Sequence, residues 1–160
     1  MSLSVRITAW SGVSENVMRW SGKLFPRLRQ ELGALDVMNL LAFIPEELID
    51  TTSEDSLYKS MARRHLLTGP MMRQGMHTAD FCCDEIVRLY RDFKCSAVVY
   101  PSHVGHRTTG STAELIKRTC NENNMPFLFV GCDVWDDRYM TPDEVFDRMK
   151  TFFEVMGLSK

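Results

Sequence analysis

Four short apolar runs, separated by longer segments of helical periodicity, are the feature that most limits how this chain can fold. The runs are expected to be strands and cover residues 3–9, 36–43, 95–100 and 126–130. The segments with apolar residues at helical spacing are residues 14–32, 54–67, 78–94, 113–123 and 142–156. Strands that alternate with helices form a parallel sheet covered on both faces. We therefore predict an α/β three-layer sandwich with a four-stranded parallel sheet in the order 2-1-3-4, as in flavodoxin-like or Rossmann-like folds.

Helix boundaries are also marked in the sequence. Ser53, Ser111 and Thr141 each precede a helical pattern and are predicted N-caps, and the last two are followed three residues later by a glutamate, as in a capping box. Pro26 lies inside the first helical segment, where a proline kinks or breaks a helix. The segment 54–67 carries an apolar stripe made of Leu57, Met61 and Leu66.

Size and composition favour one globular domain over the whole chain, residues 1–160. Of the residues, 44% are hydrophobic and 25% are charged, which is ordinary for a globular protein. The net charge of −2 argues against electrostatic capture of nucleic acid. No apolar stretch approaches the roughly 20 residues of a membrane-spanning helix, and no secretory signal is visible. Five cysteines, an odd number, favour free thiols in a reducing cytoplasm.

Polar and chelating residues gather where the third and fourth strands are expected to end. His103 and His106 are three residues apart in the turn 101–107, and Cys132 and Asp133 follow the last strand. The carboxyl ends of parallel strands form the edge of an open α/β sheet at which ligands bind. Two imidazoles with a thiol or a carboxylate can hold a metal ion. The alternative is that one histidine makes a structural hydrogen bond and the other is exposed.

Two small-residue loops before helical segments are candidate phosphate sites, because free N–H groups and the helix dipole attract anions there. They contain Ser11 and Gly12 in the first loop and Thr109, Gly110 and Ser111 in the second, which Arg107 adjoins. As plain helix caps they need no ligand. A third cluster follows the last strand and consists of Asp133, Asp136, Asp137 and Arg138. Its arginine either grips a phosphate or carboxylate or pairs with an aspartate of the same loop.

Three stretches carry a resemblance to a known family. They are residues 57–67, LYKSMARRHLL, followed by a Gly-Pro break; residues 86–106, IVRLYRDFKCSAVVYPSHVGH; and residues 125–158, which include Asp133-Val-Trp-Asp136-Asp-Arg138. In these stretches the chain resembles the C-terminal domain of the 2-hydroxyacyl-CoA dehydratase (2-hydroxyglutaryl-CoA dehydratase D-component) and benzoyl-CoA reductase subunit family.

The resemblance implies two-domain subunits that pair, a CoA thioester substrate, an activator protein that injects an electron, and an iron–sulfur cluster. His106 occupies the position at which the family has a cysteine ligand, and thiolates are the usual ligands of such clusters. The N-terminal domain that supplies the other ligands lies outside this sequence. We therefore expect a 4Fe-4S cluster, if there is one, to be shared with a partner. By resemblance the residues near the cofactor or acyl-CoA are Ser102, His103, His106, Arg107, Asp133 and Arg138, and the catalytic residues are not identified.

Three functions follow from these observations. The first is a dehydratase-like or reductase-like subunit, a lyase component inactive alone, whose partner is a second subunit that supplies the N-terminal domain, or a second copy of the chain. The second is a non-catalytic homologue that binds an acyl-CoA or another phosphate-bearing ligand. The third is a small metal-binding domain that uses His103, His106 and Cys132 or Asp133. We expect a cytoplasmic protein that binds neither nucleic acid nor membranes.

Overall fold

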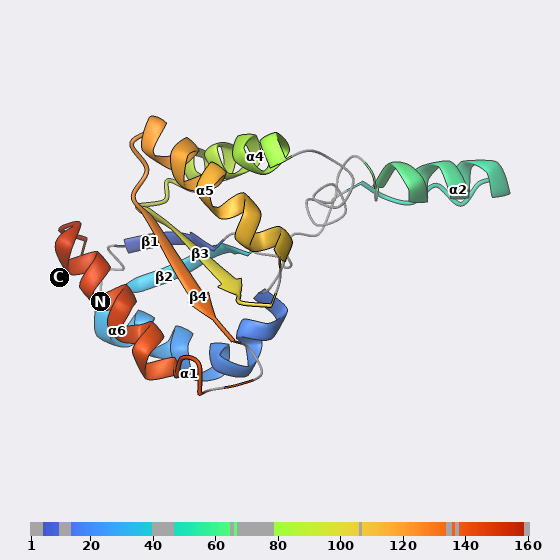
Figure 1. The fold of residues 1–160 in the computed structure, drawn as a ribbon. Helices are drawn as coiled ribbons and strands as arrows, with labels where there is room; N and C mark the ends of the chain where they lie inside the picture. The colour runs from blue at the N-terminus through green and yellow to red at the C-terminus, as the bar shows by residue number, and fades with distance from the viewer. Residues whose placement is uncertain are drawn as a thin grey trace.

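A parallel sheet with helices on both faces forms the body of the molecule (Figure 1). The computed structural model describes residues 5–9, 14–39, 47–64, 66, 79–105, 107–133, 136 and 138–158. The strands are β1 (Val5–Ala9), β2 (Ala34–Asn39), β3 (Ala97–His103) and β4 (Phe127–Cys132), and they lie in the order β2-β1-β3-β4. Every neighbouring pair is parallel. The predicted α/β class with a parallel sheet is thus confirmed.

The helices divide between the two faces of the sheet. In Figure 1, α1 (Ser14–Leu32) and α6 (Pro142–Val155) lie on one side, and α4 (Ala79–Asp92) and α5 (Arg107–Glu122) lie on the other. The remaining helix, α2 (Glu54–Arg63), stands away from this body. None of the described helices combines the length and the apolar character needed to cross a bilayer.

Alternate residues of the central strand β3 supply two hydrophobic cores. Ala97 and Val99 pack with buried residues of α1 and α6, among them Leu28 and Phe153. Val98 and Tyr100 face the opposite way and pack with buried residues of α4 and α5, which are Cys82, Cys83, Ile86, Leu89, Ile116 and Cys120. A strand buried on both faces requires apolar residues at every position, which is why residues 97–100 form an unbroken apolar run.

The capping box predicted at the start of the last helix is confirmed. Thr141 is the N-cap of α6, its hydroxyl accepts from the Glu144 backbone N–H, and the Glu144 carboxylate in turn accepts from the Thr141 N–H at 2.6 Å. Pro142 occupies the first turn, where its missing N–H leaves no intrahelical bond unmade. Ser53 likewise caps α2, with Ser56 as the reciprocal partner.

Three expectations about element boundaries are wrong. The helix α1 is not broken at Pro26, which is exposed, so of the kink or break expected there the break is excluded. The strand β3 continues through Pro101 to His103; beyond Val99 its described pairing is with β4 alone, so a proline that cannot donate is tolerated there. The helix α5 begins at Arg107, so Ser111 lies inside the helix and is not its N-cap.

The apolar stripe of α2 is the fourth difference. None of the residues of α2 is buried, and the segment that precedes the helix packs along it through polar contacts. The Asp50 N–H donates to Ser60 Oγ at 3.0 Å, and Arg63 forms an ion pair with Glu47 at 2.9 Å. The helical periodicity of residues 54–67 therefore indicates a helix correctly but not one that covers the sheet.

Candidate functional site

The carboxyl ends of β3 and β4 place the predicted site residues side by side. His103 is in register with Cys132, and the Val104 N–H donates to the Cys132 carbonyl oxygen at 3.0 Å, which extends the pairing one residue past β3. Asp133 follows at once, and α5 begins at Arg107, which is exposed. The strand-end edge therefore brings together Ser102, His103, Cys132 and Asp133.

His103 and Asp133 form the central pair of this edge. The distance from His103 Nδ1 to Asp133 Oδ1 is 3.8 Å, and each side chain is 22% exposed. This separation is longer than a hydrogen bond, and His103 Nδ1 is a buried atom without a hydrogen-bond partner. A carboxylate beside Nδ1 favours the tautomer that carries its proton on that nitrogen, which leaves Nε2 as the acceptor. A small side-chain rotation would join the pair.

Gly105 makes room for the imidazole of His103. A Cβ atom built on Gly105 would lie 3.0 Å from His103 Nε2, tighter than most real Cβ contacts, so the imidazole would have to give way by a few tenths of an ångström. The φ angle of Gly105 is not in the positive, left-handed region, so its backbone conformation does not require glycine. The absence of a side chain therefore serves the placement of the ring.

Arg138 is bound within its own loop. Its guanidinium donates to both carboxylate oxygens of Asp136, at 2.8 Å and 2.6 Å for the shortest bond to each. The hydrogen bonds from Arg138 lower the pKa of Asp136. The Asp136 N–H donates to Asp133 Oδ1 at 3.1 Å, which ties this loop to the strand-end edge. Of the two roles considered for Arg138, the structure therefore shows pairing with an aspartate of the same loop.

The second phosphate candidate differs from the expected loop. Thr109, Gly110 and Ser111 lie in the first turns of α5 and not in a loop before it. Intrahelical bonds run from an N–H to the carbonyl four residues back, so in a helix that begins at Arg107 the N–H of Thr109 still lacks such a bond, whereas that of Ser111 does not. The predicted residues Ser11, Gly12, His106 and Asp137 lie outside the described residues.

The described residues of the strand-end edge, which do not include His106, do not form a donor set that fits an iron–sulfur cluster. Within the described ranges, no three His, Cys, Asp or Glu side chains converge on a point that could hold a metal ion. Cys132 is buried in the core, where burial and the nearby Asp133 raise the pKa of its thiol to about 11. The other four cysteines are also buried. Clusters are held by thiolates, and a buried protonated thiol is a poor starting point for one.

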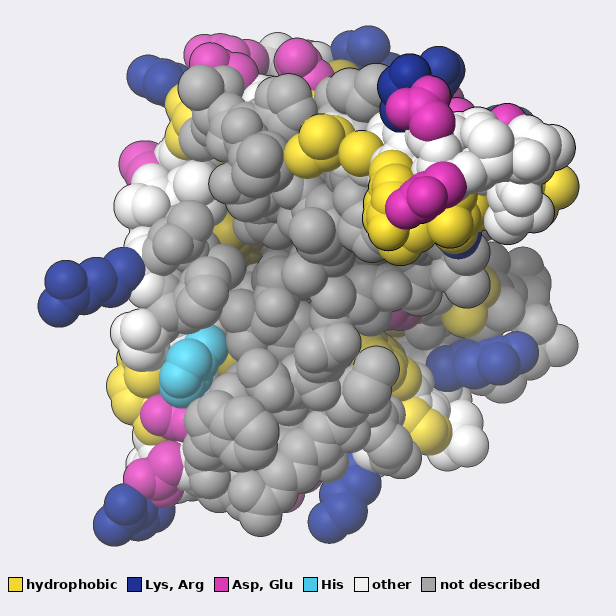
Figure 2. Space-filling model, turned by 90° about the vertical axis from the view of Figure 1, so that its right-hand side faces the viewer, with side chains coloured by type: hydrophobic (Ala, Val, Ile, Leu, Met, Phe, Trp, Pro, Cys, Tyr) yellow, Lys and Arg dark blue, Asp and Glu magenta, His cyan; other side chains and the backbone are white. Residues whose placement is uncertain are grey.

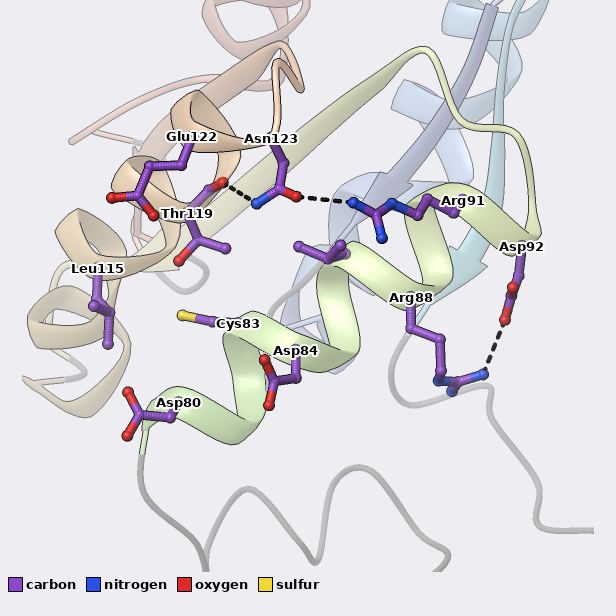
Figure 3. Close-up of a pocket in the computed structure, with 11 residues that line it drawn as sticks. Asp80, Cys83, Asp84, Arg88, Arg91, Asp92, Leu115, Thr119, Glu122 and Asn123 are labelled. Atoms are coloured by element: carbon purple, nitrogen blue, oxygen red, sulfur yellow. Dashed lines mark hydrogen bonds and ion pairs between the residues drawn. The ribbon is translucent and has the colours of Figure 1, made fainter.

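Two surface cavities lie outside the strand-end edge, and of the predicted residues only Gly110 lines one of them. A cavity of about 610 Å³ opens between α4 and α5 (Figure 3). Four of its polar side chains pair with one another: Arg88 binds Asp92, and Arg91 donates to Asn123 Oδ1 at 3.0 Å. Burial raises the pKa of Cys83, which lines it, so this thiol is not a ready nucleophile.

The second cavity has a volume of about 360 Å³ and lies between α5 and β4. Phe127 and Phe129 form one wall, and the sequence analysis did not single them out. The sequence places Phe127 and Phe129 two residues apart in a predicted strand, and hence on the same face of it. It does not predict which face of a strand at the edge of the sheet stays uncovered by helices.

Comparison with known proteins identifies the family. The model of the family described as 2-hydroxyglutaryl-CoA dehydratase, D-component, matches residues 12–156, nearly the whole chain. Searches of the curated proteins and of the solved structures found no match. The matched range contains both strands of the strand-end edge and the helices on both faces of the sheet. This chain belongs to the 2-hydroxyglutaryl-CoA dehydratase D-component family.

Proposed function

We propose that this chain is a 2-hydroxyacyl-CoA dehydratase-related subunit that acts on an acyl-CoA thioester together with a second polypeptide. The observation that carries the proposal is the family match over residues 12–156. The strand-end edge supports it, because open α/β sheets bind ligands at the carboxyl ends of their strands. Among the described residues, His103 and Asp133 are partly exposed polar side chains of this edge, and Arg107 is exposed at the start of the following helix.

In this proposal His103 holds the acyl end of the thioester. With Nδ1 turned toward Asp133, the imidazole presents Nε2 beside the bare backbone of Gly105. From there it accepts a hydrogen bond from the hydroxyl of a 2-hydroxyacyl group, and after protonation it donates one to the departing oxygen. Arg107, exposed at the start of α5, supplies positive charge for the phosphates of CoA.

The projecting helix α2 supports the need for a partner. Figure 2 views the molecule from the side of α2 and shows hydrophobic side chains gathered on the protruding part. Leu48 is 88% exposed and Tyr58 is 63% exposed. A ten-residue helix that buries no residue of its own is marginal in water, so a second chain that packs on it would stabilise it.

The partner also supplies the cluster ligands in this proposal. The described cysteines are buried, so a 4Fe-4S cluster would have to be held mainly by thiolates of the second polypeptide. When bound, such a cluster supplies single electrons.

The test is a reconstitution under anaerobic conditions. The full chain is mixed with a polypeptide that carries the N-terminal domain of the family, and iron, complex formation and binding of 2-hydroxyglutaryl-CoA are measured for each component and for the mixture. We expect a complex, iron only when the partner is present, and thioester binding that His103→Gln weakens. A mixture that neither associates nor binds any CoA thioester would overturn the proposal. Stoichiometric iron and sulfide in this chain alone would contradict the partner-held cluster.

The same measurements address the two alternatives. Thioester binding without dehydration in a complete, reduced mixture would identify a non-catalytic acyl-CoA-binding homologue. The metal-binding alternative draws no support from the described residues, since none of their His, Cys, Asp and Glu side chains converge in threes.

A further inference from the structure

The cavity of about 360 Å³ between α5 and β4 has the walls of a site for a flat ring. It lies at the end of the sheet, on the face that α5 covers, and none of the residues predicted from the sequence except Gly110 lines it. Ligand sites are typically preformed hollows of about 300–1,000 Å³ with apolar walls and a few polar groups at the rim.

Aromatic side chains form the first wall. Phe127 and Phe129 are two residues apart in β4 and so project from the same face of the strand. The Phe129 ring stacks on Tyr100 with 6.2 Å between centroids and 23° between planes. Tyr100 is fully buried, and its hydroxyl is 3.0 Å from Thr112 Oγ1 of α5. Phe129 is therefore held from behind by a fixed ring while 43% of it remains exposed.

Small side chains of α5 form the second wall. Gly110 and Ala113 are three residues apart, so both lie on the side of the helix that faces the cavity. A Cβ atom on Gly110 would meet nothing within 4 Å, and glycine is disfavoured inside a helix relative to alanine. Neither packing nor a positive φ accounts for this glycine. It leaves open space on the α5 wall of the cavity.

Two opposite charges stand at the rim. Glu114 and Lys117 line the cavity, with Lys117 Nζ 3.5 Å from a Glu114 carboxylate oxygen. Both side chains are largely exposed, so their contact is weak and each can turn to a ligand. Together they offer an acceptor for an amino group and a cation for a phosphate.

We propose that this cavity binds the adenine ring of the CoA thioester, with the ring stacked on Phe129 and Lys117 close to the ribose phosphate. The inference rests on the proposed function, because that function supplies the CoA. Adenine presents a flat π-face for Phe129 and an exocyclic amine for Glu114. From Phe129 to Asp133 the strand advances four residues, about 13 Å, so the pantetheine arm runs from the cavity toward the strand-end edge.

The test uses adenosine 3′,5′-bisphosphate, CoA and pantetheine as probes, with binding to the full chain, alone and in the complex with the partner polypeptide, measured by calorimetry. We expect the bisphosphate and CoA to bind competitively. Phe129→Ala should weaken both about 5- to 150-fold, the loss associated with one base stacked on an aromatic ring. Binding of pantetheine should not change. Gly110→Leu, which fills the cavity from the opposite wall, should weaken the bisphosphate as well.

Matched variants keep the result interpretable. Phe93 is exposed to a similar degree, 37%, and does not line the cavity, so Phe93→Ala should leave all binding unchanged. Phe129→Leu, which keeps an apolar side chain in β4, serves if Phe129→Ala does not fold. CoA binding that is unaffected by Phe129→Leu and Gly110→Leu would overturn this inference and leave the proposed function standing. Absence of binding by CoA and its thioesters in the complex would overturn both. Loss of partner association in Phe129→Ala, with bisphosphate binding unchanged, would assign the cavity to a side chain of the partner and overturn the inference.

Discussion

Substitution of Gly105 by alanine tests how the His103 imidazole is positioned. The new Cβ would lie 3.0 Å from Nε2 and 3.5 Å from Cδ2 of His103. The first contact is tighter than ordinary van der Waals contact, so the ring must move by a few tenths of an ångström. Forcing it off its rotamer costs about 0.5–1.5 kcal/mol. Alanine also reduces the entropy of the unfolded chain, which offsets about 0.4–1 kcal/mol of that cost.

The expected result is therefore a small change in stability and a clear change at the ring. The free energy of unfolding in urea should fall by no more than about 1 kcal/mol, the difference of the two opposing contributions. The ¹H–¹³C signals of the His103 ring, assigned with His103→Gln and recorded at one fixed pH, should shift. Binding of the CoA thioester to the complex should weaken in parallel.

Gly131→Ala is the matched control at the same edge. Its Cβ would lie 3.5 Å from a Phe129 ring carbon and 3.8 Å from the Tyr139 hydroxyl, which are ordinary contacts. This variant should leave the His103 signals in place. Unchanged His103 signals in Gly105→Ala, or an equal displacement in Gly131→Ala, would refute the reasoning that Gly105 makes room for the ring.

Three further predictions concern the scaffold. A double-mutant cycle of Tyr100→Phe and Thr112→Val, followed by urea unfolding, should give a coupling energy of about 0.5–1.5 kcal/mol for the 3.0 Å hydrogen bond; a value near zero would show that the hydroxyls do not interact. The hydrogen bonds from Thr141 lower the pKa of Glu144, so its contribution to stability is present above the unfolded pKa and lost as the pH falls through the folded pKa. The urea midpoint should accordingly fall less steeply below pH 4.5 in Glu144→Gln than in the unchanged chain, and equal slopes would contradict the capping box. Because all five cysteines are buried, and burial raises the pKa of Cys132 to about 11, a thiol reagent at pH 8 should modify none of them until urea is added; one rapidly labelled thiol would contradict the packing.

Local chemistry explains which parts of the fold could be predicted. The box of Thr141 and Glu144 involves neighbours in sequence, so its pattern is sufficient to locate the start of α6. The apolar run at residues 97–100 indicates a strand buried on both faces, because no other element needs every residue apolar over so short a stretch. The shared edge of His103 and Asp133 follows from parallel strands alone, since their carboxyl ends must meet.

The errors arise where tertiary contacts override local preference. Thr108–Thr112 is poor in strong helix formers and suggests a loop, yet α5 includes it, because the intrinsic preference of a few residues is small beside the packing of a 16-residue helix. Pro101 suggests the end of a strand, but a strand paired on one side can accommodate a missing donor. The distance between His103 and Asp133 depends on side-chain rotamers, which no sequence pattern encodes.

The separation of α2 from the sheet has an evolutionary consequence. Core residues such as Ile86 and Phe153 are constrained by the fold of this chain, since each is fully buried among neighbours that must change with it. Tyr58 and Leu48 have no such neighbours in the α/β body, so replacing them alters the solvent-facing surface and little else within the described structure. The residues of the projecting helix can therefore be substituted, or adapt to a different binding partner, without any compensating substitution in the sheet. Among relatives, substitutions in α2 should therefore follow changes in the partner that it contacts and not changes in the sheet.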